Sequence, residues 1–173
     1  MTIKPEASSA QKNPQGANSG AESGADCSAV AAERLTFPKS ERLRHKILVD
    51  NLFSKGTSIY DYPFRLTYRT LTHKELEESF KIGVPDGIAP LQMMVTVPKK
   101  KRRHAVDRVL MRRRIREAWR LQRRELRRAI EEHPELRTVS VALIYISTEN
   151  VDSAKIRYKL RRLIDQITTK LFA

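Results

Sequence analysis

The sequence has few of the residues on which catalysis, metal binding or disulfide bonding usually depend. A single cysteine, Cys27, excludes an internal disulfide and is typical of a protein from a reducing compartment. The six glycines are spread over the N-terminal region and the predicted turns, so they form no glycine-rich phosphate loop. The histidines lack the spacing of metal ligands, and they are His45, His73, His104 and His133. We therefore expect no catalytic group and no metal or cofactor site in the chain itself.

Long hydrophobic runs are also absent. No stretch approaches about 18 consecutive apolar residues, which excludes a transmembrane helix, and residues 1–6 lack the apolar core of a secretory signal. Acidic residues are outnumbered, with 20 Asp and Glu against 34 Lys and Arg, and the net charge is +14. This charge favours an acidic partner, either a nucleic acid or an anionic membrane. Together these features predict a cytoplasmic protein.

Most of the positive charge lies in residues 99–128. They contain three Lys and twelve Arg against three acidic residues, and therefore carry +12 of the net +14. From Ala105 to Ile130, apolar and basic side chains separate onto two faces at about 100° per residue, as in an amphipathic helix. The apolar face is formed by Met111, Ile115, Ala118, Trp119, Gln122, Leu126, Ala129 and Ile130. The basic stripe is formed by Arg112, Arg116, Arg120, Arg123 and Arg127.

The beginning of this helix favours phosphate binding. With His104 as the N-cap, Asp107 takes the acidic position of a capping box, and the basic loop 99–103 leads into the exposed N–H groups of the first turn. A solvated helix face is the alternative interpretation, but the charge is of one sign and arginine matches phosphate in a bidentate geometry. A membrane partner is disfavoured because Trp119 is the one aromatic residue on the apolar face. We therefore predict nucleic-acid binding.

The rest of the chain predicts a disordered N-terminal tail, residues 1–34, and a single RNA-binding α/β domain, residues 35–173. The first predicted helix begins at the N-cap Ser40 and ends at Lys55 before Gly56, and its Phe53 is either a core residue or a base-stacking residue. The next elements are a short strand at 57–60 and a half-exposed strand at 62–70, whose Phe64, Leu66 and Tyr68 share one face. A variable hairpin loop at 72–90, which could hold a short helical turn, leads to a strand at 91–97 and the basic helix. A buried or central strand at 139–146 and a final helix capped by Asp152 or Ser153 complete the chain.

Several motifs resemble those of a known family. They are Val97-Pro98-Lys99-Lys100 and the run from Ala105 to Ala118, supported by Lys39-Ser40-Glu41-Arg42-Leu43 and Phe53-Ser54-Lys55-Gly56. Over residues 35–171 the sequence resembles the protein component of bacterial ribonuclease P. The family has Arg-Asn-Arg after Ala-Val-x; Arg108 matches the first position, whereas Val109 and Leu110 replace the other two. This departure predicts a locally changed RNA contact.

The resemblance implies an α+β fold, an α-β-β-β-α-β-α two-layer sandwich of the ribosomal protein S5 domain 2-like type. It also implies a left-handed crossover between Val97 and Val139, against the usual preference. The function it implies is that of the protein subunit of a ribonucleoprotein endonuclease. In that family the RNA, with magnesium, cleaves precursor tRNA to produce the mature 5′ end, and the protein binds the 5′ leader between the sheet and the first helix. No protein partner is implied.

The resemblance and the basic stripe together select the candidate site residues. Those expected to face the catalytic RNA are Lys99, Lys100, Arg108, Arg112, Arg113, Arg116 and Arg120. Those expected at the leader cleft are Arg42, Phe53 and Tyr68. The alternative function is a ribosomal or general RNA-binding protein without a role in cleavage. DNA binding by the long helix is disfavoured, because no short helix and tight turn precede it.

Overall fold

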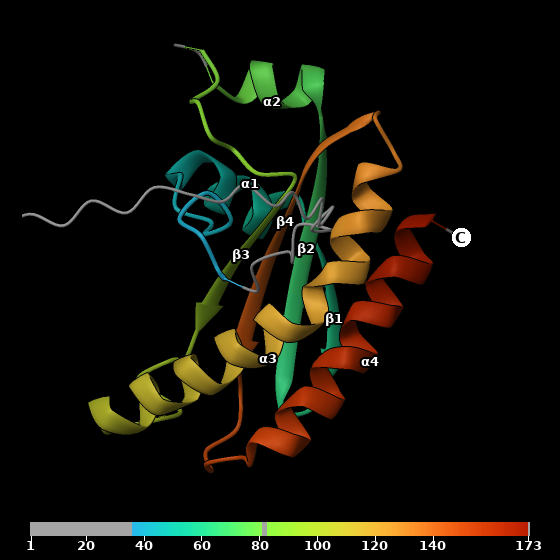
Figure 1. Ribbon diagram of the computed structural model, residues 1–173. Coiled ribbons are helices and arrows are strands. Elements are labelled where there is room, and N and C mark those ends of the chain that lie inside the picture. The colour runs from blue at the N-terminus through green and yellow to red at the C-terminus, as the bar shows by residue number, and fades with distance from the viewer. Residues whose placement is uncertain (1–35, 81–82, 173) are drawn as a thin grey trace, which may run out of the picture. The chain divides into compact units, whose positions relative to one another are not determined.

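The computed structural model describes residues 36–80 and 83–172, which belong to one unit of the chain, residues 34–173. The predicted tail, residues 1–34, lies outside the described residues. The described residues form a mixed α+β fold with a four-stranded sheet (Figure 1). In chain order the elements are α1 (Lys46–Lys55), β1 (Thr57–Asp61), β2 (Phe64–Thr72), α2 (His73–Ser79), β3 (Leu91–Thr96), α3 (Ala105–Glu131), β4 (Leu136–Tyr145) and α4 (Ser153–Phe172). None of these helices is long and apolar enough to span a membrane.

The strand order in the sheet is β1-β2-β4-β3. β4 pairs antiparallel with β2 and parallel with β3, so it is central, as its apolar sequence predicted. The predicted hairpin loop over residues 72–90 is wrong, because β4 separates β2 from β3. The short helical turn predicted as an option in this segment is present as α2, whose first turn has a capping box in which Thr72 and Glu75 bond reciprocally.

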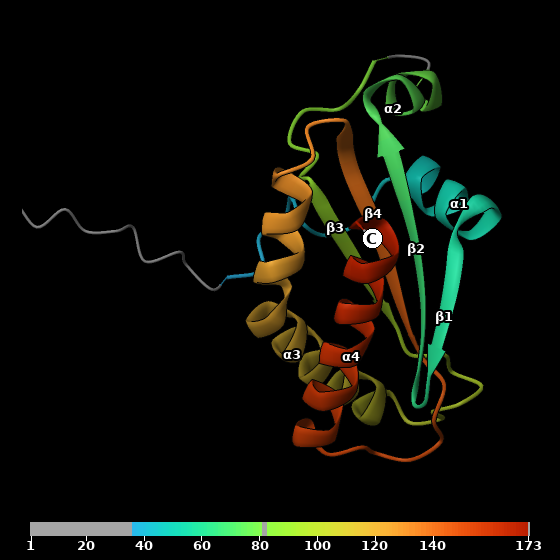
Figure 2. The same cartoon turned by 90° about the vertical axis from the view of Figure 1, so that its right-hand side faces the viewer.

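Helices lie on both faces of the sheet (Figure 2). α3 and α4 pack against one face, where the buried residues include Trp119 of α3, Leu160 of α4 and Leu143 of β4. α1 packs against the other face, where Leu48 and Leu52 join a second apolar cluster. The predicted two-layer sandwich therefore describes only the first of these packings, because α1 adds a partial third layer.

The first helix begins later than predicted. Ser40 does not cap it, because residues 41–43 pair with the edge of β3: the Met93 N–H donates to the Glu41 carbonyl at 2.8 Å, and the Leu43 N–H donates to the Met93 carbonyl at 3.1 Å. Residues that bond to a neighbouring strand cannot also close helical turns. α1 therefore begins at Lys46, after the N-cap His45.

The two long helices agree with the sequence pattern in most respects. The apolar side of α3 is buried, and Asp152 accepts a hydrogen bond from the Ala154 N–H at 2.9 Å at the beginning of α4. Arg123 is the exception in α3, since it was predicted in the exposed stripe but is only 6% exposed. The reason is an ion pair to Glu41, whose side chain is equally buried, at 2.6 Å.

Candidate nucleic-acid interface

The loop before α3 is held by one buried arginine. Arg102 is 9% exposed and donates to the Thr148 carbonyl and to the side chain of Asn150. It also lies 3.3 Å from Asp107, to which Asn150 donates at 3.2 Å. The predicted basic loop 99–103 is therefore not exposed throughout, and the predicted capping box is wrong, because His104 makes no side-chain cap and Asp107 bonds to Arg102 and Asn150. These contacts fix the loop to the segment between β4 and α4.

Arg108 also supports this loop. Its guanidinium donates to the carbonyls of Arg102 and Arg103 at 2.9 and 2.6 Å. The prediction placed Arg108 toward RNA, whereas the structure engages its side chain within the chain. Arg108 thus positions the neighbouring cations in addition to any contact of its own.

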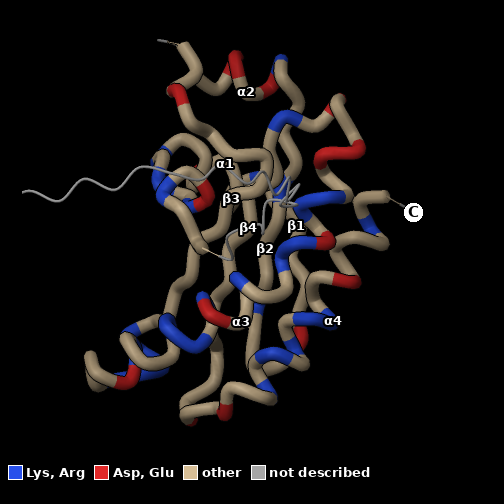
Figure 3. The backbone as a smooth tube through the Cα atoms, viewed as in Figure 1, with Lys and Arg blue, Asp and Glu red and all other residues tan. Residues whose placement is uncertain are grey.

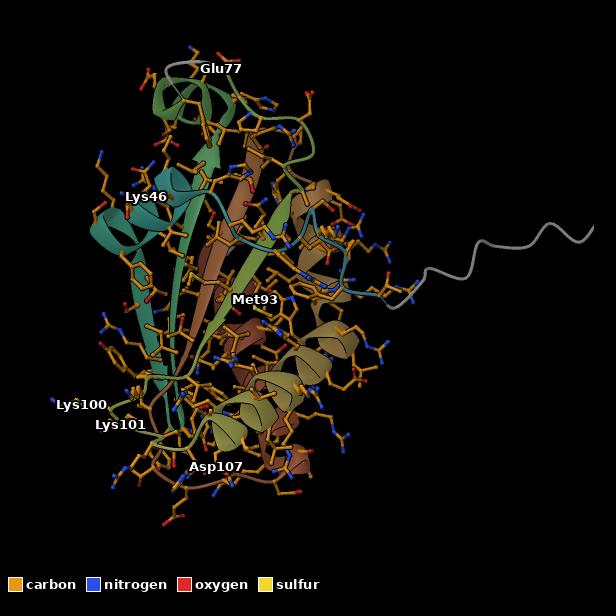
Figure 4. The ribbon with its side chains drawn as sticks, turned by 90° about the vertical axis from the view of Figure 1, so that its left-hand side faces the viewer. Lys46, Glu77, Met93, Lys100, Lys101 and Asp107 are labelled. Atoms are coloured by element: carbon orange, nitrogen blue, oxygen red, sulfur yellow. The ribbon has the colours of Figure 1, made fainter. Side chains whose placement is uncertain are left out.

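A group of cations at this end of the molecule has no partner among the residues that the structure describes. The group lies in the loop and in the first half of α3 (Figure 3), and Figure 4 shows Lys100 and Lys101 pointing away from the body of the protein. We call this group the cationic surface, and it consists of Lys99, Lys100, Lys101, Arg103, Arg112, Arg113 and Arg116. None of them makes an ion pair or a side-chain hydrogen bond within residues 36–80 and 83–172. A polyanion would relieve their mutual repulsion.

The cationic surface continues onto the segment before α1. Arg42 donates to the Phe37 carbonyl at 3.3 Å, and its guanidinium lies 5.7 Å from the centre of the Phe37 ring. Burial lowers the pKa of Arg116, and the charges of Arg42 and Arg112 lower it further. Arg42, Arg44 and Arg116 line a groove of about 310 Å³ beside β3. The structure therefore brings Arg42, a leader-cleft candidate in the sequence, beside the residues expected to face the catalytic RNA.

The second half of the predicted basic stripe is neutralised by acidic residues. Arg120 donates to Glu117 at 2.9 and 2.5 Å, which raises the pKa of Arg120 and lowers that of Glu117. Arg123 and Arg127 both bond to Glu41. Sequence reasoning placed Arg120 in the RNA-facing set, but its pairing makes it less available than Arg112 or Arg116.

The leader-cleft candidates separate in the structure. Phe53 is 48% exposed at the end of α1, so the core alternative for this residue is wrong. Tyr68 is 8% exposed and packs in the cluster under α3 and α4, on the face of the sheet opposite α1. Its placement in a cleft between the sheet and the first helix is therefore wrong, because alternation along β2 turns it to the same side as Phe64 and Leu66.

Sequence reasoning missed a row of side chains on the α1 side of the sheet. Tyr60 pairs with Arg65, Arg65 with Ile144, and Ile144 with Thr96, so the row crosses all the strands. All four side chains are at least partly exposed, and Tyr60 is 63% exposed with the Arg65 guanidinium 5.3 Å from its ring centre. The alternation of residues in β1 indicates that Tyr60 faces away from the core. Only the pairing register shows which residues of the other strands lie beside it. We call it the open row.

Gly56 joins α1 to β1 at a point with no space for a side chain. A Cβ atom there would lie 2.1 Å from the Leu52 carbonyl oxygen and 2.9 Å from Cγ2 of Thr67. The close approach holds the end of α1, which carries Phe53, next to Thr67 and Tyr68 of β2. This is a steric reason for glycine in the Phe53-Ser54-Lys55-Gly56 motif.

Comparison with known proteins decides among the RNA-binding functions. The family described as Ribonuclease P matches residues 37–168. The chain belongs to the ribonuclease P protein family. It is 29% identical over 129 residues to ribonuclease P protein components from two strains of Porphyromonas gingivalis, covering 75% of this chain and 84% of each relative. This ribonuclease P protein therefore has a role in tRNA 5′ processing as a subunit of ribonuclease P.

Solved structures show that the fold is shared. The ribonuclease P protein of Staphylococcus aureus matches with a TM-score of 0.50 and 17% identity, over 73% of this chain and 94% of that one. A mutant of the same protein matches with a TM-score of 0.52 and 16% identity, over 75% and 89%. Within the described residues of this ribonuclease P protein, no group of three or more His, Cys, Asp or Glu side chains is arranged to hold a metal ion.

Proposed function

We propose that this ribonuclease P protein binds the ribonuclease P RNA through the cationic surface and the 5′ leader of precursor tRNA through the open row. The observation that carries the proposal is the group of cations on α3 and on the loop before it, which Arg102 fixes, because these cations have no ion pair among the described residues. Guanidinium and ammonium groups bind phosphate without selecting sequence. In this proposal the RNA and magnesium supply the catalytic groups, and the protein supplies binding.

The open row supports leader binding because it combines an aromatic ring with a cation. Tyr60 offers a flat face on which a base can stack, and Arg65 can bind the adjoining phosphate. Phe53 adds a second exposed ring at the end of α1. An unpaired leader has accessible base faces, whereas paired RNA does not.

The decisive experiment is reconstitution with the ribonuclease P RNA of the same genome. Cleavage of labelled precursor tRNA is followed at low magnesium, with and without the protein, on substrates that carry a leader of several nucleotides or of one nucleotide. We expect the protein to stimulate cleavage, and the longer leader to bind more tightly. Tight RNA binding without stimulation would favour the alternative, a ribosomal or general RNA-binding protein.

The leader contact has its own matched pair of variants. Tyr60→Ala should weaken binding of the long-leader substrate by about tenfold and leave the short-leader substrate unchanged, because one stacked base is lost. Tyr158→Ala is the control, since Tyr158 is 62% exposed on α4, away from the open row, against 63% for Tyr60. Equal effects of the two variants on the long-leader substrate would contradict the proposed contact.

We also propose the handedness of one crossover, the location of the protein and its partners. The path from β3 through α3 to β4 in Figure 1 supports a left-handed crossover. A role in tRNA processing supports a cytoplasmic location. The partners we propose are the ribonuclease P RNA and precursor tRNA, with no cofactor held by the protein and no protein partner required.

A further inference from the structure

Three aliphatic side chains in the first two turns of α3 are exposed. Val106 is 79% exposed, Val109 is 38% exposed and Leu110 is 37% exposed. Residues three and four apart lie on the same side of a helix, so these side chains form a continuous strip, which we call the aliphatic ridge. Single exposed aliphatic residues are ordinary, whereas a contiguous apolar strip within a charged surface indicates a contact.

The ridge lies inside the cationic surface. Arg103 precedes it in the chain and Arg113 follows it one turn later, and both are exposed and unpaired within the described part of the chain. Asp107, in the same two turns, already bonds to Arg102 and Asn150. A partner that covers the ridge must therefore combine negative charge with an apolar surface.

An unstacked nucleotide has both properties. In a regular RNA duplex the base faces are covered by their neighbours, and the outer surface consists of phosphates and 2′-hydroxyls, which an aliphatic side chain cannot bond. A base displaced from the stack exposes a flat apolar face with a phosphate on each side, and aliphatic side chains pack against such faces in other complexes.

We propose that the aliphatic ridge packs against an unstacked base of the ribonuclease P RNA, while Arg103 and Arg113 bind the phosphates on either side of that base. The inference rests on the proposed function, since it names the feature of the RNA that this part of the cationic surface takes. It also gives Val109 and Leu110 a role, because an apolar contact replaces the polar one that the family pattern has there.

The test replaces the ridge with polar residues of similar shape, in the variant V106T/V109T/L110Q. We expect its affinity for the ribonuclease P RNA of the same genome, measured by filter binding, to fall about 5- to 20-fold at every salt concentration. The slope of log K against log salt should stay the same, because no charge is removed. Leu121→Gln is the matched control, since Leu121 is 41% exposed on the same helix, and it should change affinity less than about twofold.

A second readout locates the contact. Dimethyl sulfate probing should show an unpaired base that wild type and Leu121→Gln protect and that V106T/V109T/L110Q leaves reactive. Unchanged affinity of the triple variant, or a shallower salt slope for it, would overturn the inference. The proposed function would stand in that case, provided that the wild-type protein binds the RNA. A self-association of the free protein that the triple variant abolished would assign the ridge to a second copy and also overturn it. Wild-type protein without salt-dependent binding to this RNA would overturn the proposed function as well.

Discussion

Replacing Arg112 and Arg116 together with alanine removes two cations from the middle of the cationic surface. Neither side chain has an ion pair or a side-chain hydrogen bond within residues 36–80 and 83–172. The pKa of Arg116 is lowered by burial and by the charges of Arg42 and Arg112, so these cations repel one another in the free protein. The double variant should therefore fold normally, with a free energy of unfolding equal to that of wild type or slightly higher.

The loss in RNA affinity follows from counterion release. Each phosphate contact contributes about 0.7 to 0.9 to the slope of log K against log salt, so the slope should become shallower by about 1.4 to 1.8. If the ionic contribution vanishes near 1 M salt, each contact is worth a factor of about 4 to 6 at about 0.15 M. Two contacts then give a loss of about 15- to 30-fold at that salt concentration.

The assay is filter binding of the ribonuclease P RNA over a series of salt concentrations, with circular dichroism as the check on folding. A matched control, Arg128→Ala with Lys170→Ala, removes the same charge from exposed positions near the ends of α3 and α4. It should change affinity less than about threefold, because neither residue belongs to the cationic surface and no proposed phosphate contact is lost. A folded Arg112/Arg116 variant with the wild-type slope and affinity would refute the assignment of these residues to the RNA.

Three further changes test the stability of the fold. Glu41→Ala should destabilise the protein by about 3 to 5 kcal/mol in urea denaturation, because it leaves Arg123 buried without its carboxylate. Thr72→Ala should cost about 1 kcal/mol by the same measurement, through loss of the α2 cap. The backbone hydrogen bond from Thr72 lowers the pKa of Glu75, so the stabilisation from this hydrogen bond is present at neutral pH. It should be lost as the pH falls through the lowered pKa, and urea denaturation over a pH series would show this loss. Gly56→Ala should cost about 1 to 3 kcal/mol in thermal unfolding, because its Cβ would meet the Leu52 carbonyl oxygen.

The pattern of apolar residues along the sequence correctly predicted the elements in which that pattern is long. α3 spans Ala105–Glu131 and buries its apolar side, and β4 is central, because in both cases the pattern extends over many residues. The prediction that Ser40 caps the first helix was wrong for the opposite reason. A capping signal is local, and the backbone bonds between residues 41–43 and Met93 are made to a strand about fifty residues later in the chain.

The candidate site shows the same limit. The charge of residues 99–128 located the cationic surface, but the buried pair of Arg123 and Glu41 joins residues 82 positions apart, and no local pattern marks it. For Tyr68, alternation predicted that it shares a face with Phe64 and Leu66. The face that α1 covers is a property of the assembled sheet, so Tyr68 was assigned to the wrong side. The open row needed the pairing register for the same reason.

The structure changes the salt dependence that charge alone predicts. If all fifteen basic residues of 99–128 bound phosphate, the slope of log K against log salt would be about −10 to −14. Many of them already have partners within the chain, and these are Arg102, Arg108, Arg114, Arg120, Arg123, Arg124, Arg127 and Arg128.

The cationic surface alone gives a slope of about −5 to −6. We expect a measured value in that range for wild-type protein and the ribonuclease P RNA, with Glu41 and Arg123 still paired in the complex. A slope beyond about −10 would mean that ion pairs within the chain open on binding. In that case Glu41→Gln, which loosens the pair with Arg123, should strengthen RNA binding instead of leaving it unchanged. Binding measured with this variant therefore distinguishes a preformed surface from one that the RNA creates.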